Sequence, residues 1–200
     1  MDQSPAPIAA EDDDAQLLQR IACQDRGALA TLYERHHRPL FTFLLQHTRD
    51  HGLAEELLQD TFVAVWRGAD GFDERFRDGT STARAWLTGI ARRQAHNTLR
   101  RMRLPLADVS ALEDVAAPDP EPETWTLTMS TRDELLDAFE RLPLRYREIA
   151  VLALMQDYSY AEMAEILDVP LGTVKSRLAA AKRQLRTLLA PGKEDSDESR

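Results

Sequence analysis

Residues 159–185, SYAEMAEILDVPLGTVKSRLAAAKRQL, predict two short helices joined by a tight turn. Ser159 and Glu162 have the spacing of a capping box, in which two side chains satisfy free backbone N–H groups at the start of a helix. Asp168 lies where the first helix should end, and Pro170 suits the first turn of the second helix. The pattern fits a packed helical hairpin or a helix-turn-helix, and the outward side chains have to distinguish the two.

The apolar spacing predicts which side chains of this pair pack inward: Ala161, Met163, Ala164, Leu167, Val174 and Leu178. The small size of Ala161, Ala164 and Gly172 fits a close crossing of the helices. The side chains left outward near the start of the second helix are Thr173, Lys175, Ser176 and Arg177. A helix-turn-helix places such positions against base edges in the major groove, and Gly172 permits close approach to phosphate. A solvated basic face on a hairpin has the same period, so this stretch alone leaves both interpretations open.

The negative charge of the chain is concentrated outside two basic helices. The formal net charge is −9, but residues 1–14 carry −5, residues 104–130 carry −6 and residues 191–200 carry −2. Six arginines and no acid lie in residues 84–103, and five basic residues and no acid lie in residues 171–189. The net charge argues against a general nucleic-acid binder, but this distribution leaves two local basic surfaces that can bind a nucleic acid.

Composition predicts a helical protein of a reducing compartment. Two hundred residues with 43% hydrophobic content suffice for a packed core, and the small number of glycines favours helices. The single cysteine, Cys23, excludes an internal disulfide and is expected to be a buried small side chain. The longest apolar run, residues 149–155, is too short to cross a bilayer, and the acidic start is unlike a secretory signal. We therefore expect a cytoplasmic protein without membrane insertion.

The expected fold is all-α, with two small helical domains joined by a flexible acidic linker and a helix-turn-helix in the C-terminal domain. The expected divisions are a disordered acidic N-terminus (1–14), a first domain (15–103), an acidic, proline-rich linker (104–130), a second domain (131–190) and a disordered tail (191–200). Asp14 is expected to cap the first helix. Trp125, a large apolar residue within the linker, is expected to pack onto a neighbouring domain.

Apolar residues at helical spacing run through both domains. In the first, Pro39 predicts a kink or a break in the stripe over residues 29–45. A helix over residues 54–66 follows, with Leu57, Leu58, Phe62 and Val65 inward and Glu56, Gln59 and Asp60 grouped on another side. After a loop over residues 67–82, a helix over residues 83–101 is expected. In the second domain, Pro143 ends a stripe over residues 135–142, and residues 149–155 belong to the next helix.

Two distant parts of the chain resemble the same family. Residues 136–189, LDAFERLPLRYREIAVLALMQDYSYAEMAEILDVPLGTVKSRLAAAKRQLRTLL, resemble the fourth conserved region of bacterial sigma factors of the sigma-70 family, and more narrowly the extracytoplasmic-function (ECF) group. LuxR-type regulators share only the "TVK" part. The segments LAEELLQDTFVAVW (53–66) and RAWLTGIARRQAHNTLRR (84–101) resemble the second conserved region of the same sigma group. The two matches stand in the family's order, where a LuxR-type regulator would carry a receiver or ligand-binding domain.

The resemblance implies a non-catalytic specificity subunit that directs core RNA polymerase to promoters and opens the DNA strands. It implies that one face docks on the clamp helices of the core, at positions matching Glu56, Gln59 and Asp60. It implies contact with the minus-10 element through Arg84, Trp86, Arg92, Arg93, Asn97, Arg100 and Arg101. It implies contact with the minus-35 element through Gly172, Thr173, Lys175, Ser176, Arg177, Lys182 and Arg183. An anti-sigma protein is a further candidate partner, and the bound protein is expected at the nucleoid.

The chain departs from the family's pattern at positions that read DNA. Arg93 stands near a base-reading position where the family has an asparagine, and Thr88 stands where an aromatic residue is common. Ala179 and Ala180 replace part of a segment that often contains an arginine. The preferred promoter sequence therefore cannot be copied from relatives, while Lys182 and Arg183 keep positive charge beside the recognition helix.

Other functions receive less support from the sequence. His47 and His51 are four residues apart, but no cysteine lies near them and a helix end is expected between them, so we expect no metal site. His36 and His37 are interpreted as packing or surface groups. No phosphate-binding loop, nucleophile elbow or catalytic carboxylate pair is present, so we expect neither an enzyme nor a cofactor. A helix-turn-helix regulator that works without polymerase and a sigma-like decoy that binds an anti-sigma protein remain as alternatives.

Overall fold

The computed structural model describes residues 13–72, 82–102 and 132–189. Helices and turns make up these three ranges, and no strand occurs in them, which confirms the all-α fold class. The expectations for the N-terminal segment 1–12, the linker 104–130 with Trp125, and the tail 191–200 lie outside the described residues, as does most of the loop after residue 72. No helix in the described ranges is both long enough and apolar enough to cross a membrane.

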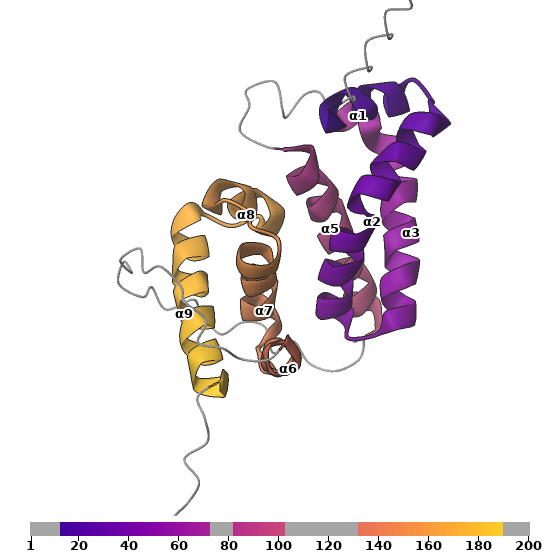
Figure 1. Cartoon of the computed structure of the whole chain (residues 1–200). Coiled ribbons are helices and arrows are strands. Elements are labelled where there is room, and N and C mark those ends of the chain that lie inside the picture. Colours follow the sequence, from indigo (N-terminus) through magenta and orange to yellow (C-terminus); the bar gives the residue numbers. More distant parts are fainter. Residues whose placement is uncertain (1–12, 73–81, 103–131, 190–200) are drawn as a thin grey trace, which may run out of the picture.

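The described helices form two groups that lie side by side (Figure 1). The first group, indigo to magenta in the figure, contains α1 (Asp14–Ala22), α2 (Arg26–Thr48), α3 (His51–Gly68), the short 3₁₀ helix η1 (Ala69–Gly71) and α5 (Ala83–Met102). The second group, orange to yellow, contains α6 (Arg132–Arg141), α7 (Leu144–Ala150), the π-helical turn η2 (Val151–Met155), α8 (Tyr160–Leu167) and α9 (Leu171–Leu189).

Short-range side-chain caps define the helix starts in the first group. Asp13 caps α1 in a capping box with Gln16, so the expectation that Asp14 is the cap is wrong by one residue. Asp14 is instead the first helical residue, and its carboxylate contacts His36 Nε2 at 2.6 Å. Asp50 caps α3 by accepting from the Leu53 N–H. In each case a carboxylate satisfies N–H groups that have no partner within the helix.

Helix α2 continues through Pro39, so a break at this residue does not occur. The missing N–H removes one hydrogen bond of the helix, but the long buried stripe of α2 still packs on α1, α3 and α5. Cys23, which its residue type predicts to be buried, is exposed, because it follows the last residue of α1 at the turn into α2. At this turn, the position of Cys23 in the chain outweighs the usual preference of cysteine for burial.

The core of the first group is built from aliphatic side chains of all four of its α-helices. Fully buried members include Leu17, Leu18, Ile21, Leu32, Leu44, Leu57 and Leu87, together with Phe43. The full buried sets of α1, α2 and α3 recur mainly at three- and four-residue spacing, so each of these helices buries one stripe. The inward residues predicted for α3, which are Leu57, Leu58, Phe62 and Val65, are all buried. The opposite faces of α3 and α5 are thereby oriented outward.

In the second group, the predicted helix pair is present. Ser159 and Glu162 form the capping box of α8, with the Ser159 N–H donating to Glu162 Oε2 at 2.9 Å and the Glu162 N–H donating to Ser159 Oγ at 3.3 Å. Asp168 ends α8 in the left-handed conformation with a φ of 54°. Val174 and Leu178 of α9 are buried, as are Met163 and Leu167 of α8. The tight turn, the caps and most of the inward faces are confirmed.

Three small residues do not form the expected close crossing. Ala161 is exposed and Ala164 is only half-buried, while Ile166 is buried on the packed side of α8. Gly172 is exposed, and a Cβ added to it would meet no atom within 4 Å among the described residues. The pair is packed by the larger apolar side chains of α8 and α9, so the small size of Gly172 has no role in the packing of the described helices.

The two helix groups contact one another directly. Helix α8 packs on α5, and α7 and η2 pack on α2. Figure 1 shows α7 and α8 on the side of the second group that faces α2 and α5, while α9 lies farther away. The predicted helix over residues 149–155 is in fact the end of α7 followed by the π-helical turn η2. The chain then turns at Asp157, which has a positive φ of 51°, and enters α8.

Candidate nucleic-acid interface

Helix α5 presents a basic face that divides into two parts. Its start is held by the Thr82 hydroxyl, which accepts from the Ala85 N–H at 3.2 Å, and its inward side buries Leu87 and Ala91. Of the residues predicted to contact the minus-10 element, those in the C-terminal half are exposed: Arg93, Asn97, Arg100 and Arg101. Those in the N-terminal half are half-buried: Arg84, Trp86 and Arg92.

The exposed half of α5 combines cations with planar polar groups. Arg100 and Arg101 lie in the last turn, where positive charge is favourable because of the helix dipole. Arg101 Nε donates to the Asn97 carbonyl at 3.3 Å, which orients the guanidinium along the helix. His96, between Arg93 and Asn97, is also exposed on this half of the helix. The sequence does not predict a role for it, because a lone histidine belongs to no recognisable motif. This face can attract phosphate and stack on unpaired bases.

The half-buried arginines of α5 are bound by the second helix group. Arg84 Nη1 donates to the Gln156 carbonyl at 3.0 Å, and its guanidinium lies 4.0 Å above the ring of Tyr158. Arg92 Nε donates to Glu148 Oε1 at 3.0 Å. The sequence predicts both arginines as DNA contacts and does not predict these partners. Each partner is more than 50 residues away along the chain.

Trp86 packs against its own helix group. Its ring meets Phe72 edge-to-face with the ring centroids 5.5 Å apart, and it is half-buried beside the core. Such pairs are favourable because the positive edge of one ring meets the negative face of the other. A packing role for Trp86 therefore has a specific partner in the structure.

Helix α9 carries the residues predicted to read the minus-35 element. Gly172 and Arg183 are exposed, and Thr173, Lys175, Ser176, Arg177 and Lys182 are half-buried. Ser176 Oγ donates to the Thr173 carbonyl at 3.1 Å, so this hydroxyl is partly used within the helix. Tyr160 and Leu171, which the sequence did not single out, are 44% and 47% exposed at the first residues of α8 and α9. The sequence does not single them out because large apolar side chains are usually expected in a core.

The outer face of α3 is acidic with one apolar residue. Glu56, Gln59 and Asp60 are all exposed, as the spacing predicted. Val63 is 45% exposed and lies four residues after Gln59 and three after Asp60, so it shares their face. No pattern in the sequence singles out Val63, because a valine within an apolar stripe is usually buried. An acidic face with an apolar residue beside it is suited to binding a protein that presents basic and apolar groups.

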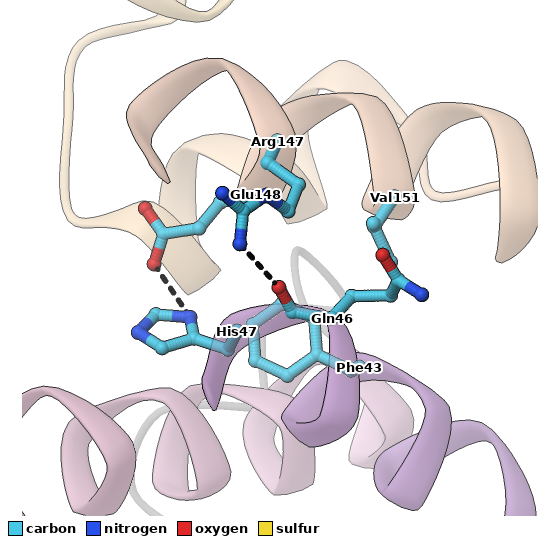
Figure 2. Close-up of a pocket in the computed structure, with 6 residues that line it drawn as sticks. All are labelled: Phe43, Gln46, His47, Arg147, Glu148 and Val151. Atoms are coloured by element: carbon cyan, nitrogen blue, oxygen red, sulfur yellow. Dashed lines mark hydrogen bonds and ion pairs between the residues drawn. The ribbon is translucent and has the colours of Figure 1, made fainter. Parts of the chain in front are cut away.

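A buried polar cluster lies between α2 and α7, as Figure 2 shows. Glu148 Oε1 lies 3.2 Å from His47 Nδ1 but not in hydrogen-bond alignment, and it accepts from Arg92 Nε. Arg147 Nη1 donates to the Gln46 carbonyl at 2.9 Å. The other donors of Arg147 bond carbonyls at the end of α6, including Leu142 at 2.8 Å. None of these interactions was predicted from the sequence.

Burial changes the acidity of three groups at this contact. Burial lowers the pKa of His47, with Glu148 opposing this effect and Arg92, His96 and Arg147 adding to it. Burial also lowers the pKa of Arg147 to about 10, so the guanidinium stays charged at neutral pH. Burial raises the pKa of Tyr158, which keeps its hydroxyl neutral. At neutral pH the cluster therefore combines a neutral His47 with a charged Arg147.

His47 and His51 do not form a metal site in the structure. His47 is buried near the end of α2 beside Glu148, whereas His51 is the exposed first residue of α3, 3.5 Å from Glu55. A helix end lies between them, as expected. The described residues contain no group of three or more side chains that could hold a metal ion. His36 and His37 contact Asp14 and Tyr33, respectively, which confirms their interpretation as packing and surface groups.

Comparison with known families assigns both helix groups. Residues 32–104 match the family "Sigma-70 region 2", and residues 132–185 match "Sigma-70, region 4". The chain is 34% identical over 183 residues to the ECF RNA polymerase sigma factor SigM of Mycobacterium tuberculosis H37Rv, and the match covers 90% of this chain and 86% of that protein. It is 29% identical over 191 residues to SigK of Mycobacterium bovis BCG, and this match covers 92% and 96%.

Solved structures show the same fold. CnrH, solved in complex with the cytosolic domain of CnrY, aligns with a TM-score of 0.62 and 23% identity over 89% of this chain and 97% of that one. RpoE from Bartonella quintana, solved with the anti-sigma factor NepR, aligns with a TM-score of 0.57 and 24% identity over 80% and 96%. Both sigma-70 regions are thus present, and a relative above 30% identity covers nine-tenths of the chain. The chain belongs to the ECF group of the sigma-70 family, the non-catalytic subunits that direct RNA polymerase to promoters.

Proposed function

We propose that this sigma factor uses three separate helix faces: α3 for core polymerase, α5 for the minus-10 element and α9 for the minus-35 element. The observation that carries the proposal is that one chain presents two basic helices, α5 and α9, together with an acidic face on α3. The order of these helices is that of the two sigma-70 regions in the family. The division into domains at residues 15–103 and 131–190 is part of the proposal.

Helix α3 binds the clamp helices of the polymerase core through Glu56, Gln59 and Asp60. All three are exposed, and Val63 beside them adds apolar area that is removed from water on docking. Charged rim residues chiefly determine the association rate and orientation, while the apolar centre slows dissociation. An exposed valine on the same helix face as Glu56 and Asp60 supports a protein partner in preference to DNA.

Helix α5 opens and holds the minus-10 element. Its arginines attract the backbone, and planar groups such as those of Asn97 and Arg93 can hold unstacked bases of one strand. Strand opening requires no bond chemistry, because capture of extruded bases offsets an unstacking cost of a few kcal/mol. The exposed half of α5 supports this role directly.

Helix α9 reads the minus-35 element in the major groove. Its N-terminal turns carry Gly172, Thr173, Lys175, Ser176 and Arg177, and Lys182 and Arg183 follow one to two turns later. Gly172 is open on its outer side, which leaves room for a phosphate at the helix start. Base preference at this element depends on which of the half-buried polar groups reach the groove.

An anti-sigma protein is the proposed third partner. Support comes from RpoE, a neighbour of the same fold that was solved with the anti-sigma factor NepR. The proposed place of action is the cytoplasm, at the nucleoid when the chain is bound to polymerase, because both promoter DNA and the core enzyme are found there.

The proposal is tested by adding the purified chain to core polymerase, measuring binding, and mapping run-off transcripts across genomic DNA. Core binding together with new start sites that share two sequence elements is the expected result. Absence of core binding would contradict the proposal. Core binding without any new start site would support a decoy, and promoter footprints by the chain without polymerase would support a stand-alone regulator.

A further inference from the structure

The contact between the two helix groups has two polar ends. At one end, Glu148 is 6% exposed and contacts Arg92 and His47. At the other end, the hydroxyl of Tyr158 lies 2.7 Å from Thr88 Oγ1, and its ring lies under the guanidinium of Arg84. Both ends join the second helix group to α5, and the first also reaches α2. The contact is therefore anchored along the helix proposed to bind the minus-10 element.

Bridging hydrogen bonds add to these two ends. Gln156 Nε2 donates to the Pro39 carbonyl at 2.7 Å, and Thr82 Oγ1 donates to Glu162 Oε1 at 2.7 Å. Burial favours the neutral form of Glu162, but hydrogen bonds from Thr82 and Ser159 outweigh it and lower the pKa of this carboxyl. Glu162 is therefore an ionised acceptor at neutral pH. The contact is a polar seam with a specific register, which a non-specific collapse of two apolar faces would lack.

The ion pair at Glu148 depends on the contact. The ion-pair partners of its carboxylate, Arg92 and His47, both come from the first helix group. A buried charge is tolerated only when it is paired, and separation of the groups returns Glu148 and Arg92 to water. The structure therefore holds two charges that are matched when the groups are together and solvated when they are apart.

Two of the arginines proposed to bind promoter DNA are covered by this contact. Arg84 donates to the carbonyls of Gln156 and Asp157, and the side chain of Arg92 is 19% exposed in its pair with Glu148. These contacts occupy N–H donors of both guanidinium groups and leave both side chains half-buried, which restricts their access to phosphate or a base. Arg100 and Arg101, farther along α5, are exposed. The second helix group thus covers one half of the α5 surface and leaves the other half open.

We propose that this contact is an autoinhibitory latch, in which residues 144–162 of the second group withhold Arg84 and Arg92 from DNA until the two groups separate. The latch regulates the surface assigned under the proposed function and rests on that assignment. Because the closed and DNA-bound forms exclude one another, opening increases DNA affinity and DNA binding promotes opening to the same extent. Substitutions on the second group can therefore change DNA binding by α5 without altering α5.

The test uses the full chain with Glu148→Ala and, separately, Tyr158→Phe. Neither residue belongs to the proposed DNA-binding sets. Glu165→Ala is the matched control for charge, because Glu165 is an exposed acid on α8. Tyr160→Phe is the matched control for the hydroxyl, because Tyr160 is exposed two residues from Tyr158. Far-UV circular dichroism verifies that each variant keeps its helix content.

Two readouts are measured on each variant. Energy transfer between dyes on the exposed native Cys23 and on a cysteine at exposed Thr187 reports the separation of the two groups. Fluorescence anisotropy reports binding to a labelled 20-nucleotide oligodeoxythymidine at 50 and 200 mM KCl. Each additional phosphate that the protein neutralises on a single strand makes the slope of log K against log salt steeper by about 0.7. If one or two arginines are released, the gain in affinity over the wild type should therefore be about three- to sevenfold smaller at 200 mM KCl than at 50 mM KCl.

We expect Glu148→Ala to lower energy transfer and to raise oligonucleotide affinity with a steeper salt dependence, and Tyr158→Phe to do so more weakly. Both control variants should match the wild type in energy transfer, and Glu165→Ala should show only the small increase in affinity that follows from one lost negative charge. Addition of the oligonucleotide to the wild type should itself lower energy transfer. If Arg92→Ala in the Glu148→Ala background abolishes the increase in affinity, the released arginine is its source.

Three outcomes would overturn the latch. Unchanged energy transfer in Glu148→Ala would mean that this residue does not hold the groups together. If Glu148→Ala lowers energy transfer but binds the oligonucleotide no more tightly than Glu165→Ala does, the contact does not mask DNA-binding groups. Absence of oligonucleotide binding by the opened chain would mean that no DNA surface lies beneath the contact. The proposed function is judged separately by run-off transcription with core polymerase, so normal transcription beside any of these outcomes would reject the latch alone.

Discussion

At the scale of single residues, a side-chain cap holds the start of α8, and a buried ion pair joins α7 to α5. Ser159 and Glu162 are three residues apart, and their capping box follows from sequence spacing alone. The partner of Glu148 is 56 residues away, so no local pattern could identify Arg92 as its ion pair. Cys23 and Ala161 were misplaced for a related reason: their small, apolar character predicts burial, but their positions in the fold expose them.

Loss of the α8 cap should destabilise the second helix group. In Ser159→Ala the Glu162 N–H loses its side-chain acceptor, which costs about 0.5–2 kcal/mol of unfolding free energy. Denaturant unfolding of the full chain, followed by circular dichroism, measures this loss. Ser159→Thr keeps a hydroxyl that accepts from the Glu162 N–H and donates to Glu162 Oε2, and should restore most of the stability. Equal stability of the alanine variant and the wild type would show that the cap contributes nothing.

His47 should make closure of the two groups sensitive to pH. Burial lowers the pKa of His47 in the closed form, with Arg92, His96 and Arg147 adding to the effect and Glu148 opposing it. In the open form the imidazole returns to its ordinary pKa of about 6.5. Above that value both forms hold neutral His47 and closure is fully favoured. As the pH falls below it, the open form takes up the proton first, and closure weakens.

The pH effect is measured by energy transfer between the two groups from pH 7.5 to 5.5, with dyes that do not titrate in this range. Transfer should fall with pH in the wild type and fall less in His47→Gln. His51→Gln is the control, because His51 is exposed and pairs with Glu55 outside the buried cluster. If His47→Gln and the wild type share one profile, the titrating group is another one.

At the scale of elements, helix existence and most boundaries followed from periodicity. The helix predicted over residues 83–101 spans Ala83–Met102, because its apolar stripe and lack of proline leave few alternatives. Of the kink or break predicted at Pro39, the break does not occur, since tertiary packing along α2 outweighs the one hydrogen bond that proline removes. The π-helical turn after α7 was missed, because nothing in an apolar run such as VLALM distinguishes it from an α-helix.

The acidic face of α3 should bind the polymerase core. Replacing Glu56 and Asp60 together with alanine removes two exposed charges from this face, so core affinity should fall while the helical fold is kept. Binding to core polymerase, measured by surface plasmon resonance, should show the loss chiefly in the association rate, because exposed charges steer encounter. The matched control replaces Glu34 and Asp70, two exposed acids elsewhere. Equal affinity of the two double variants would reject the clamp assignment.

The apolar member of this face makes a separate contribution. Val63→Asp keeps the helix but places another charge where the partner is expected to bury an apolar group. It should raise the dissociation rate from the core in the same assay, unlike the loss of charge at Glu56 and Asp60. An unchanged dissociation rate would place Val63 outside the interface.

At the scale of the whole molecule, the two helical units and their order were predictable, but the way they meet was not. The family regions and the all-α class follow from motifs that each lie within one unit. The contact of α8 with α5 and of α7 with α2 depends on side chains from both units, and the bonds described above are polar. Polar residues at helical spacing are usually assigned to solvent, so a polar seam is the least predictable kind of interface.

The assignment of the two DNA elements can be tested by crossing one substitution with altered promoters. Run-off transcription is measured with core polymerase on one responsive promoter, on a version with a scrambled minus-35 element, and on a version with a scrambled minus-10 element. Lys175→Ala is compared with the wild type and with Arg141→Ala, which removes an exposed positive charge at the end of α6. A good base-edge contact by Lys175 corresponds to about 1–3 kcal/mol of binding free energy.

If α9 reads the minus-35 element, Lys175→Ala should lower transcription from the intact promoter and from the promoter with the scrambled minus-10 element by the same factor. It should cause no further loss on the promoter with the scrambled minus-35 element, because the contact is already absent there. An undiminished effect of Lys175→Ala on the scrambled minus-35 promoter would contradict the assignment of α9 to that element.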